Sequence, residues 1–291
     1  MLNILVTGAN GQVGSEIRAL SSSTPDNYFF TDKETLDITD EKSLFSYVKE
    51  NNIGAILNCS AYTAVDKAEE EAEKANNINN LAVKSLAQIA KAKSISLIHL
   101  STDYVFDGKN YRPYVEDDAV EPQSVYGETK LKGEKALQEI NPANAIIIRT
   151  SWVYSSFGNN FVKTMLRLGK ERESLGVIFD QVGTPTYARD LAQAMLDILP
   201  QLHTQNHTNV EIYHYSNEGV LSWYDFAKEI MKMAKISCQI NPIETKEYPT
   251  PASRPHYSLL NKAKIKETFN INIPYWKDGL DACLRELGER K

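Results

Sequence analysis

A phenol and an ammonium group lie four residues apart in one stretch of the sequence. Tyr126 and Lys130 belong to segment 124–135, whose pattern predicts a helix, so both side chains project from one face. An unperturbed phenol titrates near pH ~10, and a cation within roughly 4 to 6 Å favours its ionised form. We therefore predict that Lys130 lowers the pKa of Tyr126 and makes it a better proton donor.

The same spacing occurs a second time, at Tyr224 and Lys228. Tyr126 lies in the part of the chain where strands and helices alternate, whereas Tyr224 comes after that part has ended. Apolar residues such as Phe226 and Ile230 surround the second copy and indicate packing in a core. We therefore predict that Tyr126 is the reactive phenol.

A glycine-rich loop near the start of the chain is the second candidate site. Residues 2–7 form a short β-rich run, and the loop that follows carries Gly8, Gly11 and Gly14 before a helical pattern begins. Glycine lets the backbone approach a pyrophosphate, and a helix N-terminus offers free N–H groups. The spacing G-x-x-G-x-x-G differs from the common G-x-G-x-x-G, but its place between strand and helix predicts a dinucleotide site.

The end of the second predicted strand bears on the choice of cofactor. This strand, 28–31, ends at Asp32, about where an acidic residue would bond the adenosine ribose 2′-hydroxyl of NADH. The neighbouring Lys33 would instead receive the 2′-phosphate of NADPH. The sequence leaves both cofactors open.

Strands and helices alternate through the first half of the chain. The further segments predicted there are strands at 55–59, 96–100 and 145–149 and helices at 43–48 and 82–92. This alternation predicts an α/β fold with a doubly wound (Rossmann) parallel sheet, covered by helices on both faces. Such sheets bind ligands at the carboxyl ends of their strands, where Thr102 and Asp103 follow the fourth strand.

The pattern is less regular beyond residue 154. The segments predicted there are helices at 160–173, 190–199, 223–234 and 273–287, strands near 177–179 and 212–216, and a polar turn at 201–209. The segments up to 216 are candidates to complete the sheet. The dinucleotide-binding domain is thus predicted to comprise residues 1–152 and roughly 174–216, and a smaller, interleaved C-terminal substrate lobe to comprise roughly 153–173 and 217–291.

Composition narrows the class of partner. The chain has 291 residues, 42% of them apolar, which suffices for a sizeable core. Its net charge of -6 argues against a nucleic-acid partner, and no apolar run approaches the ~20 residues that span a membrane.

No signal peptide is recognisable at Met1, so we expect a cytoplasmic protein. Three scattered cysteines, Cys59, Cys238 and Cys283, indicate inert thiols rather than a zinc site or disulfides.

Taken together, the glycine loop, Thr102 and the pair Tyr126 and Lys130 resemble the extended short-chain dehydrogenase/reductase superfamily. Within it, longer motifs resemble the dTDP-4-dehydrorhamnose reductase family over nearly the whole chain. These motifs are AVDKAE at 64–69, STDYVFDG at 101–108, YGETKLKGE at 126–134, RTSWVY at 149–154 and YPTPASRP at 248–255.

The resemblance implies a role for each matching residue. Tyr126 would be the proton donor, Lys130 would hold the nicotinamide ribose, and Thr102 would bond the substrate carbonyl. The matched cofactor positions are Gly8, Gly11, Gln12, Val13, Gly14, Asp32, Asp37, Ile38, Ala61, Tyr62, Thr63, Leu100, Tyr126 and Lys130. The implied substrate positions are Thr102, Asp103, Trp152, Asn160 and Arg254.

The resemblance also implies a reaction. It is the reduction, by NADH or NADPH, of the C4 ketone of dTDP-4-dehydro-6-deoxy-L-mannose to dTDP-L-rhamnose, the last step of dTDP-rhamnose synthesis for cell-surface polysaccharide. The implied partner is a dTDP-sugar. Some members bind Mg²⁺ at a dimer contact through acidic residues, two of which match Glu16 and Glu286. Arg189 takes the third position, so we expect no metal and leave a homodimer open.

Two alternatives stay open. A nucleotide-sugar epimerase or dehydratase shares the fold, the glycine loop and Tyr-x-x-x-Lys, but dehydratases carry Asp-Glu after the threonine, and here Tyr104 follows Asp103. A non-catalytic subunit that binds the cofactor is the other alternative, since the regulatory subunit of methionine adenosyltransferase resembles the same family. The intact Thr102, Tyr126 and Lys130 favour an enzyme.

Overall fold

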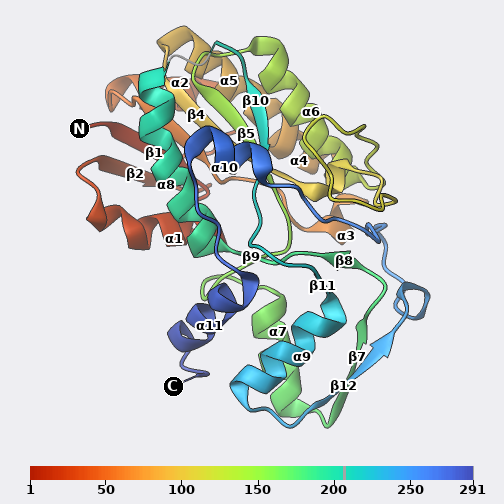
Figure 1. Ribbon diagram of the computed structural model, residues 1–291. Coiled ribbons are helices and arrows are strands. Elements are labelled where there is room, and N and C mark those ends of the chain that lie inside the picture. Colours follow the sequence, from red (N-terminus) through yellow and green to blue (C-terminus); the bar gives the residue numbers. More distant parts are fainter. Residues whose placement is uncertain (206–207, 291) are drawn as a thin grey trace.

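A six-stranded parallel sheet forms the centre of the larger of two lobes (Figure 1). The computed structural model describes residues 1–205 and 208–290. Neighbouring strands follow the order β10 (Glu211–His214), β5 (Ala145–Thr150), β4 (Ser96–Thr102), β3 (Ala55–Asn58), β1 (Asn3–Thr7) and β2 (Asn27–Thr31). Every pairing between them is parallel. The predicted doubly wound fold is confirmed.

Helices cover both faces of this sheet, which is why its strands are continuous apolar runs. In β1, Ile4 and Val6 face one core cluster, and Leu5 between them faces the opposite cluster. One face is covered by α1 (Gln12–Leu20) and α8 (Ala188–Gln205), and the other by α2 (Glu41–Glu50), α5 (Ala82–Lys93) and α6 (Val125–Ile140). The loops between β3 and α5 contain α3 (Val65–Ala68), α4 (Ala72–Asn76) and the π-helical turn η2 (Asn77–Leu81).

Helix α6 carries both Tyr126 and Lys130. It begins where the Ser124 hydroxyl accepts a hydrogen bond from the Gly127 N–H, at 3.2 Å. Deeper in the helix, the Glu134 carboxylate accepts hydrogen bonds from the Ser101 hydroxyl of β4 and from the Arg149 guanidinium of β5. The guanidinium Nη2 lies 2.7 Å from Glu134 Oε2, and both side chains are almost fully buried. This interior ion pair ties α6 to β4 and β5.

A smaller lobe packs below the sheet in the view of Figure 1. Its elements are α7 (Phe161–Glu171), β7 (Ser174–Ile178), α9 (Trp223–Ala234), β12 (Gln239–Ile243) and α11 (Trp276–Glu286). They share one apolar core, to which Phe226, Ile230 and Leu280 contribute fully buried side chains. Strand β7 pairs with β12 in parallel. The lobe therefore has a core of its own.

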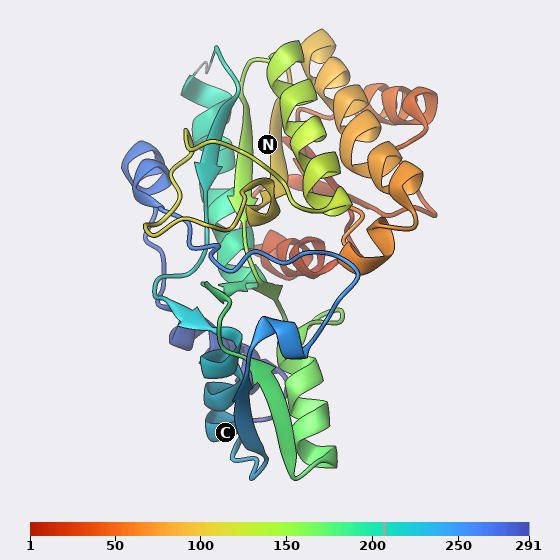
Figure 2. The ribbon, with the colours of Figure 1, turned by 90° about the vertical axis from the view of Figure 1, so that its right-hand side faces the viewer.

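Short strand pairs and a long crossing segment join the two lobes. The pairs are β6 (Val153–Tyr154) with β9 (Thr186–Tyr187), and β8 (Val182–Gly183) with β11 (Leu221–Ser222). After β12 the chain crosses back over the larger lobe, which can be followed in Figure 2, to α10 (Ala263–Phe269). On the way the Tyr257 N–H donates to the Gly108 carbonyl, at 3.0 Å. No helix in the described part of the chain is long and apolar enough to cross a bilayer.

Two placements differ from the prediction. The strand expected near 177–179, in the dinucleotide-binding domain, is β7 and lies in the smaller lobe. Only alternate residues of β7, Leu175 and Val177, are buried, because one face of this strand is exposed. Helix α10 packs instead on the core of the larger lobe through Ile265 and Phe269, although residues 217–291 were expected in the smaller one.

The remaining boundaries of the two predicted domains stay a prediction. The polar turn expected at 201–209 is shorter than predicted, because α8 continues through Gln205. Residues 206–207 of that turn lie outside the described residues.

Replacing Glu134 should destabilise the protein strongly. In Glu134→Gln the buried Arg149 guanidinium loses its counter-charge, and breaking a buried pair costs about 3 to 5 kcal/mol of unfolding free energy. Glu128→Gln on the same helix is the control, because Glu128 pairs with Lys132 at the surface, where such pairs contribute below about 1 kcal/mol. Urea unfolding followed by circular dichroism measures both. Equal midpoints for the two variants would contradict the anchoring role of Glu134.

Candidate active site

A cavity of about 650 Å³ opens at the carboxyl edge of the sheet. It is lined by the carboxyl ends of the first five strands in the chain or the segments that follow them, together with α6, since the ends of parallel strands meet at one edge. The predicted cofactor residues that line it are Gly8, Gly11, Gln12, Val13, Asp32, Asp37, Ile38, Ala61, Thr63, Leu100, Tyr126 and Lys130. The structure thus brings together residues from distant parts of the chain.

The glycine loop forms a tight cradle at one end of the cavity. Gly8 has φ of 65°, and a Cβ there would lie 2.7 Å from the Ser60 nitrogen. A Cβ on Gly14 would lie 2.5 Å from the Gly8 carbonyl oxygen. No side chain caps the start of α1, so its first N–H groups are left for an anion. These residues fit the pyrophosphate of a dinucleotide.

Asp32 and Lys33 both line the cavity beyond the cradle. The Asp32 carboxylate accepts hydrogen bonds from the backbone and hydroxyl of Thr35 and from the Glu34 N–H, which lower its pKa. The Asn10 amide also donates to it. The Asp32 carboxylate, which these hydrogen bonds hold in place, and the Lys33 ammonium therefore both lie where the ribose 2′-position is expected.

Gly14 and Tyr62 are predicted cofactor residues that do not line the cavity. Gly14 lets the start of α1 lie directly against the backbone of Gly8 and Ala9. The backbone of Tyr62 exchanges two hydrogen bonds with the Asn79 amide, at 2.9 and 3.1 Å. Its hydroxyl donates to Glu71, and its ring packs with Ala68 in a small core. Tyr62 therefore holds the wall of the cavity in place.

Further residues line the cavity without having been predicted as cofactor residues. Ser60, Ser101 and Thr150 follow or end predicted strands, and that position is a signal that could have identified them. Lys74, Asn77 and Ile78 come from α4 and the π-helical turn, for which the sequence pattern gives no signal. The others are Asn10, Leu36, Thr39, Cys59, Val153, Gly158 and Asn159.

Tyr126 lines the cavity, and Thr102 lies close to it at the end of β4. The Thr102 side chain is near enough to the Tyr126 hydroxyl to act against the rise of its pKa. Thr102 also donates to the Asp103 carboxylate, at 3.0 Å, and the Tyr104 ring packs edge-on against Tyr126 with centroids 5.4 Å apart. Two hydroxyls are thus placed to meet one oxygen atom of a substrate.

The predicted lowering of the Tyr126 pKa is wrong. Burial raises the pKa of Tyr126 to about 12, although the Thr102 side chain opposes this change. The ammonium of Lys130 is directed to the Leu100 carbonyl, to which it donates at 2.6 Å. Burial lowers the pKa of Lys130 itself to about 8. Removal from water outweighs the effect of the cation on the phenol.

Asp103 lies buried next to this pair of hydroxyls. Burial raises its pKa to about 7, against the opposing hydrogen bond from Thr102. Its second oxygen, Oδ2, is buried and has no hydrogen-bond partner within the described residues. The carboxyl group is therefore about half protonated near pH 7.

The other predicted substrate residues lie where the two lobes meet. The Trp152 ring, on a residue with φ of 49°, stacks on Trp223 of α9 with centroids 3.6 Å apart. The Asn160 amide caps α7 and donates to Gln12 of the glycine loop, at 2.9 Å. Arg254 forms a two-pronged ion pair with Asp66, at 2.8 and 2.9 Å. Asp66 therefore fixes the direction of the Arg254 side chain.

The second Tyr-x-x-x-Lys copy belongs to the smaller lobe. Tyr224 and Lys228 lie on α9, with the ammonium 5.6 Å from the centre of the phenol ring. Neither lines the cavity at the sheet edge.

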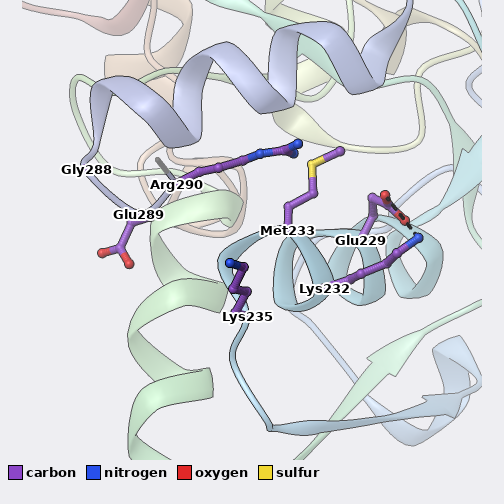
Figure 3. Close-up of a pocket in the computed structure, with 7 residues that line it drawn as sticks. All are labelled: Glu229, Lys232, Met233, Lys235, Gly288, Glu289 and Arg290. Carbon is purple, nitrogen blue, oxygen red and sulfur yellow. Dashed lines mark ion pairs between the residues drawn. The ribbon is translucent and has the colours of Figure 1, made fainter.

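A separate hollow of about 770 Å³ lies between the end of α9 and residues 288–290 (Figure 3). Several of its charged groups form ion pairs at the surface. Lys232 pairs with Glu229 (Figure 3), and Arg290 pairs with Asp281. It contains none of the predicted site residues. The larger volume therefore does not mark the reactive site, which the chemistry of the side chains places at the sheet edge.

The acidic residues considered for Mg²⁺ do not fit a cation. The Arg189 guanidinium lies 3.0 Å from Glu286 and 3.7 Å from Glu16, between the two carboxylates. Its charge takes the place that a metal would have. Within residues 1–205 and 208–290, no group of three or more His, Cys, Asp or Glu side chains is arranged to hold a metal ion. The homodimer stays a prediction.

A glycine cradle and a Tyr-x-x-x-Lys pair at the carboxyl edge of a parallel sheet define a short-chain dehydrogenase/reductase. The family model described as the RmlD substrate binding domain matches residues 2–289. A relative from Aggregatibacter actinomycetemcomitans, named dTDP-4-dehydrorhamnose reductase, is 40% identical over 96% of this chain and 97% of its own length. The chain belongs to the dTDP-4-dehydrorhamnose reductase family.

Solved structures of similar proteins agree with this assignment. A dTDP-4-dehydrorhamnose reductase from Clostridium acetobutylicum has a TM-score of 0.93 at 40% identity, with 99% of this chain and 100% of that chain covered. The enzyme of the same name from Bacillus anthracis, solved in complex with NADP, has a TM-score of 0.92 at 36% identity and covers 98% of this chain and 99% of its own.

Asp103 should make the stability of the protein depend on pH. Because its pKa is raised in the folded state, the folded protein keeps a proton that the unfolded chain releases, and stability falls as pH rises from about 4 to about 7. Asp103→Asn removes this dependence. The free energy of unfolding of the variant, relative to that of the wild type, should therefore increase as pH rises across that range. Urea unfolding at a series of pH values measures the difference.

Asp40→Asn is the control for this measurement. Asp40 caps α2 and its pKa is lowered by hydrogen bonds from Ser43, so its contribution to stability is instead lost as pH falls. A difference between Asp103→Asn and wild type that did not change with pH would contradict the state assigned to Asp103.

Proposed function

We propose that this chain catalyses the reduction, by NADPH or NADH, of the C4 ketone of dTDP-4-dehydro-6-deoxy-L-mannose to dTDP-L-rhamnose. The observation that carries the proposal is the pair of neighbouring hydroxyls, Thr102 and Tyr126, next to the cavity that the glycine cradle lines. Relatives 40% identical over nearly the whole chain bear the name of this activity. The product is the end of dTDP-rhamnose synthesis for cell-surface polysaccharide.

The side chains at the edge of the sheet have separate roles in the proposed reaction. A reduced nicotinamide dinucleotide, with its pyrophosphate held by the glycine cradle, would supply hydride to the carbonyl carbon. Thr102 and Tyr126 donate hydrogen bonds to the carbonyl oxygen as its negative charge grows, and Tyr126 then gives up its proton. The raised pKa of Tyr126 suits this role, because the phenol stays protonated at neutral pH until a more basic alkoxide forms.

The contacts between the lobes support a role in holding the substrate. Trp152 and Asn160 stand on either side of the junction, and Asp66 holds Arg254 in a fixed direction. We infer that Arg254 and Asn160 receive the diphosphate and that Trp152 packs on the deoxysugar. Orientation of this kind places the ketone against the two hydroxyls.

A dehydratase is less well supported by the same geometry. Elimination of water needs a second carboxylate after Thr102 and Asp103, and the structure has the Tyr104 ring at that place, packed against Tyr126. A non-catalytic subunit differs from an enzyme in one measurable property, which is consumption of the cofactor.

The test of the function is loss of the absorbance of reduced nicotinamide when purified protein meets the dTDP-linked 4-keto sugar. We expect rapid oxidation of the cofactor with the dTDP-sugar and much slower oxidation with a UDP-linked analogue. Cofactor binding without oxidation would support the regulatory alternative and overturn the proposal.

Replacing Tyr126 by Phe should abolish most of the activity and leave cofactor affinity nearly unchanged. Loss of a general acid lowers turnover by about 10² to 10⁴-fold. Tyr224→Phe is the matched control, since this residue repeats the motif in the smaller lobe and should keep full turnover. Steady-state kinetics and fluorescence titration with NADPH measure the two properties. A Tyr126→Phe enzyme with wild-type turnover would remove Tyr126 from the role.

We infer that Lys33 meets the 2′-phosphate when NADPH is the cofactor. The Bacillus anthracis relative was solved with NADP, and here Lys33 lines the cavity beside Asp32. Lys33→Ala should weaken NADPH about 2- to 5-fold, the effect of one exposed charge pair, and leave NADH affinity unchanged. Fluorescence titrations with both cofactors measure this. An equal loss for NADH would show that Lys33 does not contact the phosphate.

A further inference from the structure

Four buried polar side chains form a continuous chain beneath the active site. The Thr7 hydroxyl of β1 donates to Asn58 Oδ1 of β3 at 2.7 Å, and Asn58 Nδ2 lies 2.9 Å from His99 Nδ1 of β4. His99 Nε2 in turn lies 3.5 Å from Lys130 Nζ of α6. None of the four is more than 2% exposed. Polar groups so deeply buried are retained at a cost, and only Lys130 has a role so far.

The direction of these contacts fixes the tautomer of His99. The backbone N–H of Ser60, which can only donate, donates to Asn58 Oδ1 at 3.2 Å. The amide NH₂ of Asn58 therefore faces His99, and Nδ1 of the imidazole accepts from it. Burial and the nearby ammonium keep the pKa of His99 well below its usual value, so the ring is neutral. Its one proton is then on Nε2, the nitrogen that faces Lys130.

An N–H bond that points at Lys130 disfavours the ammonium form of that residue. The positive end of this bond dipole repels a charged Nζ but donates to the lone pair of a neutral amine. Burial acts in the same direction, whereas the Glu134 carboxylate opposes it. Arg149 of β5 balances the charge of Glu134, and the other titratable groups nearby are Tyr126 on the same helix and Asp103, which acts on Tyr126.

We propose that His99 is a positioning residue for Lys130. Its Nε2–H, oriented by Asn58, holds Lys130 Nζ against the Leu100 carbonyl and lowers the affinity of that nitrogen for a proton. The Leu100 contact of 2.6 Å fixes the other side of Nζ. The sheet itself, through β1, β3 and β4, thus determines where the lysine nitrogen lies and how readily it loses a proton.

This inference deepens the proposed function and rests on it for its catalytic consequence. After Tyr126 has given its proton to the substrate oxygen, the phenolate regains a proton from Lys130. An N–H bond of the ammonium breaks and the O–H bond of Tyr126 forms again. The remaining amine accepts the hydrogen bond from His99 and takes up a proton from solvent through the cavity that it lines before the next turnover. A lysine of ordinary proton affinity would return this proton less readily.

The test measures the protonation of Lys130 directly. Protein labelled with ¹³C at the lysine Cε is titrated by NMR, and the Lys130 signal is identified by its loss in Lys130→Met. Its midpoint in the wild type should lie near pH 8. His99→Phe removes the N–H without adding charge and should raise the midpoint by about one pH unit, the effect of losing one hydrogen bond to the neutral amine.

Asn58→Asp tests the tautomer with almost no change of shape. The new carboxylate accepts from Nδ1–H, so Nε2 loses its proton and becomes an acceptor for the ammonium of Lys130. The midpoint should rise by more than in His99→Phe. If His99→Phe does not fold, the Lys130 midpoint in Asn58→Asp still tests the role of His99. Thr7→Val is the matched control: it removes one hydroxyl from the chain but leaves Asn58 oriented by the Ser60 N–H, so the midpoint should not move.

The outcomes separate the inference from the proposed function. Unchanged midpoints in His99→Phe and Asn58→Asp would overturn the role of His99, whatever the substrate is. Absence of turnover in the wild type would overturn the proposed function and leave the NMR result valid. In the active enzyme, the alkaline limb of the turnover profile should shift with the Lys130 midpoint in each variant, while the KM for the cofactor changes little. A purely structural role for His99 would not move that limb.

Discussion

The carboxylate of Glu134 binds three elements of the larger lobe at one buried point. It accepts hydrogen bonds from Ser101 on β4 and Arg149 on β5, and it lies on α6 one turn beyond Lys130. A buried charge is stable only when its partners are all in place, so this contact allows little freedom between helix and strands. Because Thr102 ends β4 and Tyr126 begins α6, the distance between their hydroxyls follows from this interior contact rather than from the loops around the site.

The central sheet and the residues at its edge could be derived from the sequence because both obey local rules. Strands covered on two faces are continuous apolar runs, and parallel strands bring their carboxyl ends to one edge. Gly8, Leu100 and Ala61 therefore fall on the cavity wall once the strands are placed. Helix α9 begins and ends as predicted, since a serine that caps its start and an amphipathic repeat define it.

What could not be derived depends on the surroundings of a residue in space. The spacing of Tyr126 and Lys130 gives their proximity but not their loss of contact with water, which sets both pKa values. The sequence of β7 is apolar enough for a strand of the main sheet. Only the structure shows that β7 pairs with β12 instead and that one of its faces is exposed. The pairing of Arg254 with Asp66 joins residues that no sequence pattern connects.

The way the chain passes between the lobes affects how the protein can be made and altered. The smaller lobe is assembled from three separate stretches, and between them the chain returns to the larger lobe to add α8, β10 and α10. A growing polypeptide therefore completes neither core until almost its last residues have left the ribosome. For the same reason no single continuous gene segment encodes the smaller lobe alone, so an exchange of one segment cannot transfer this lobe by itself to another protein.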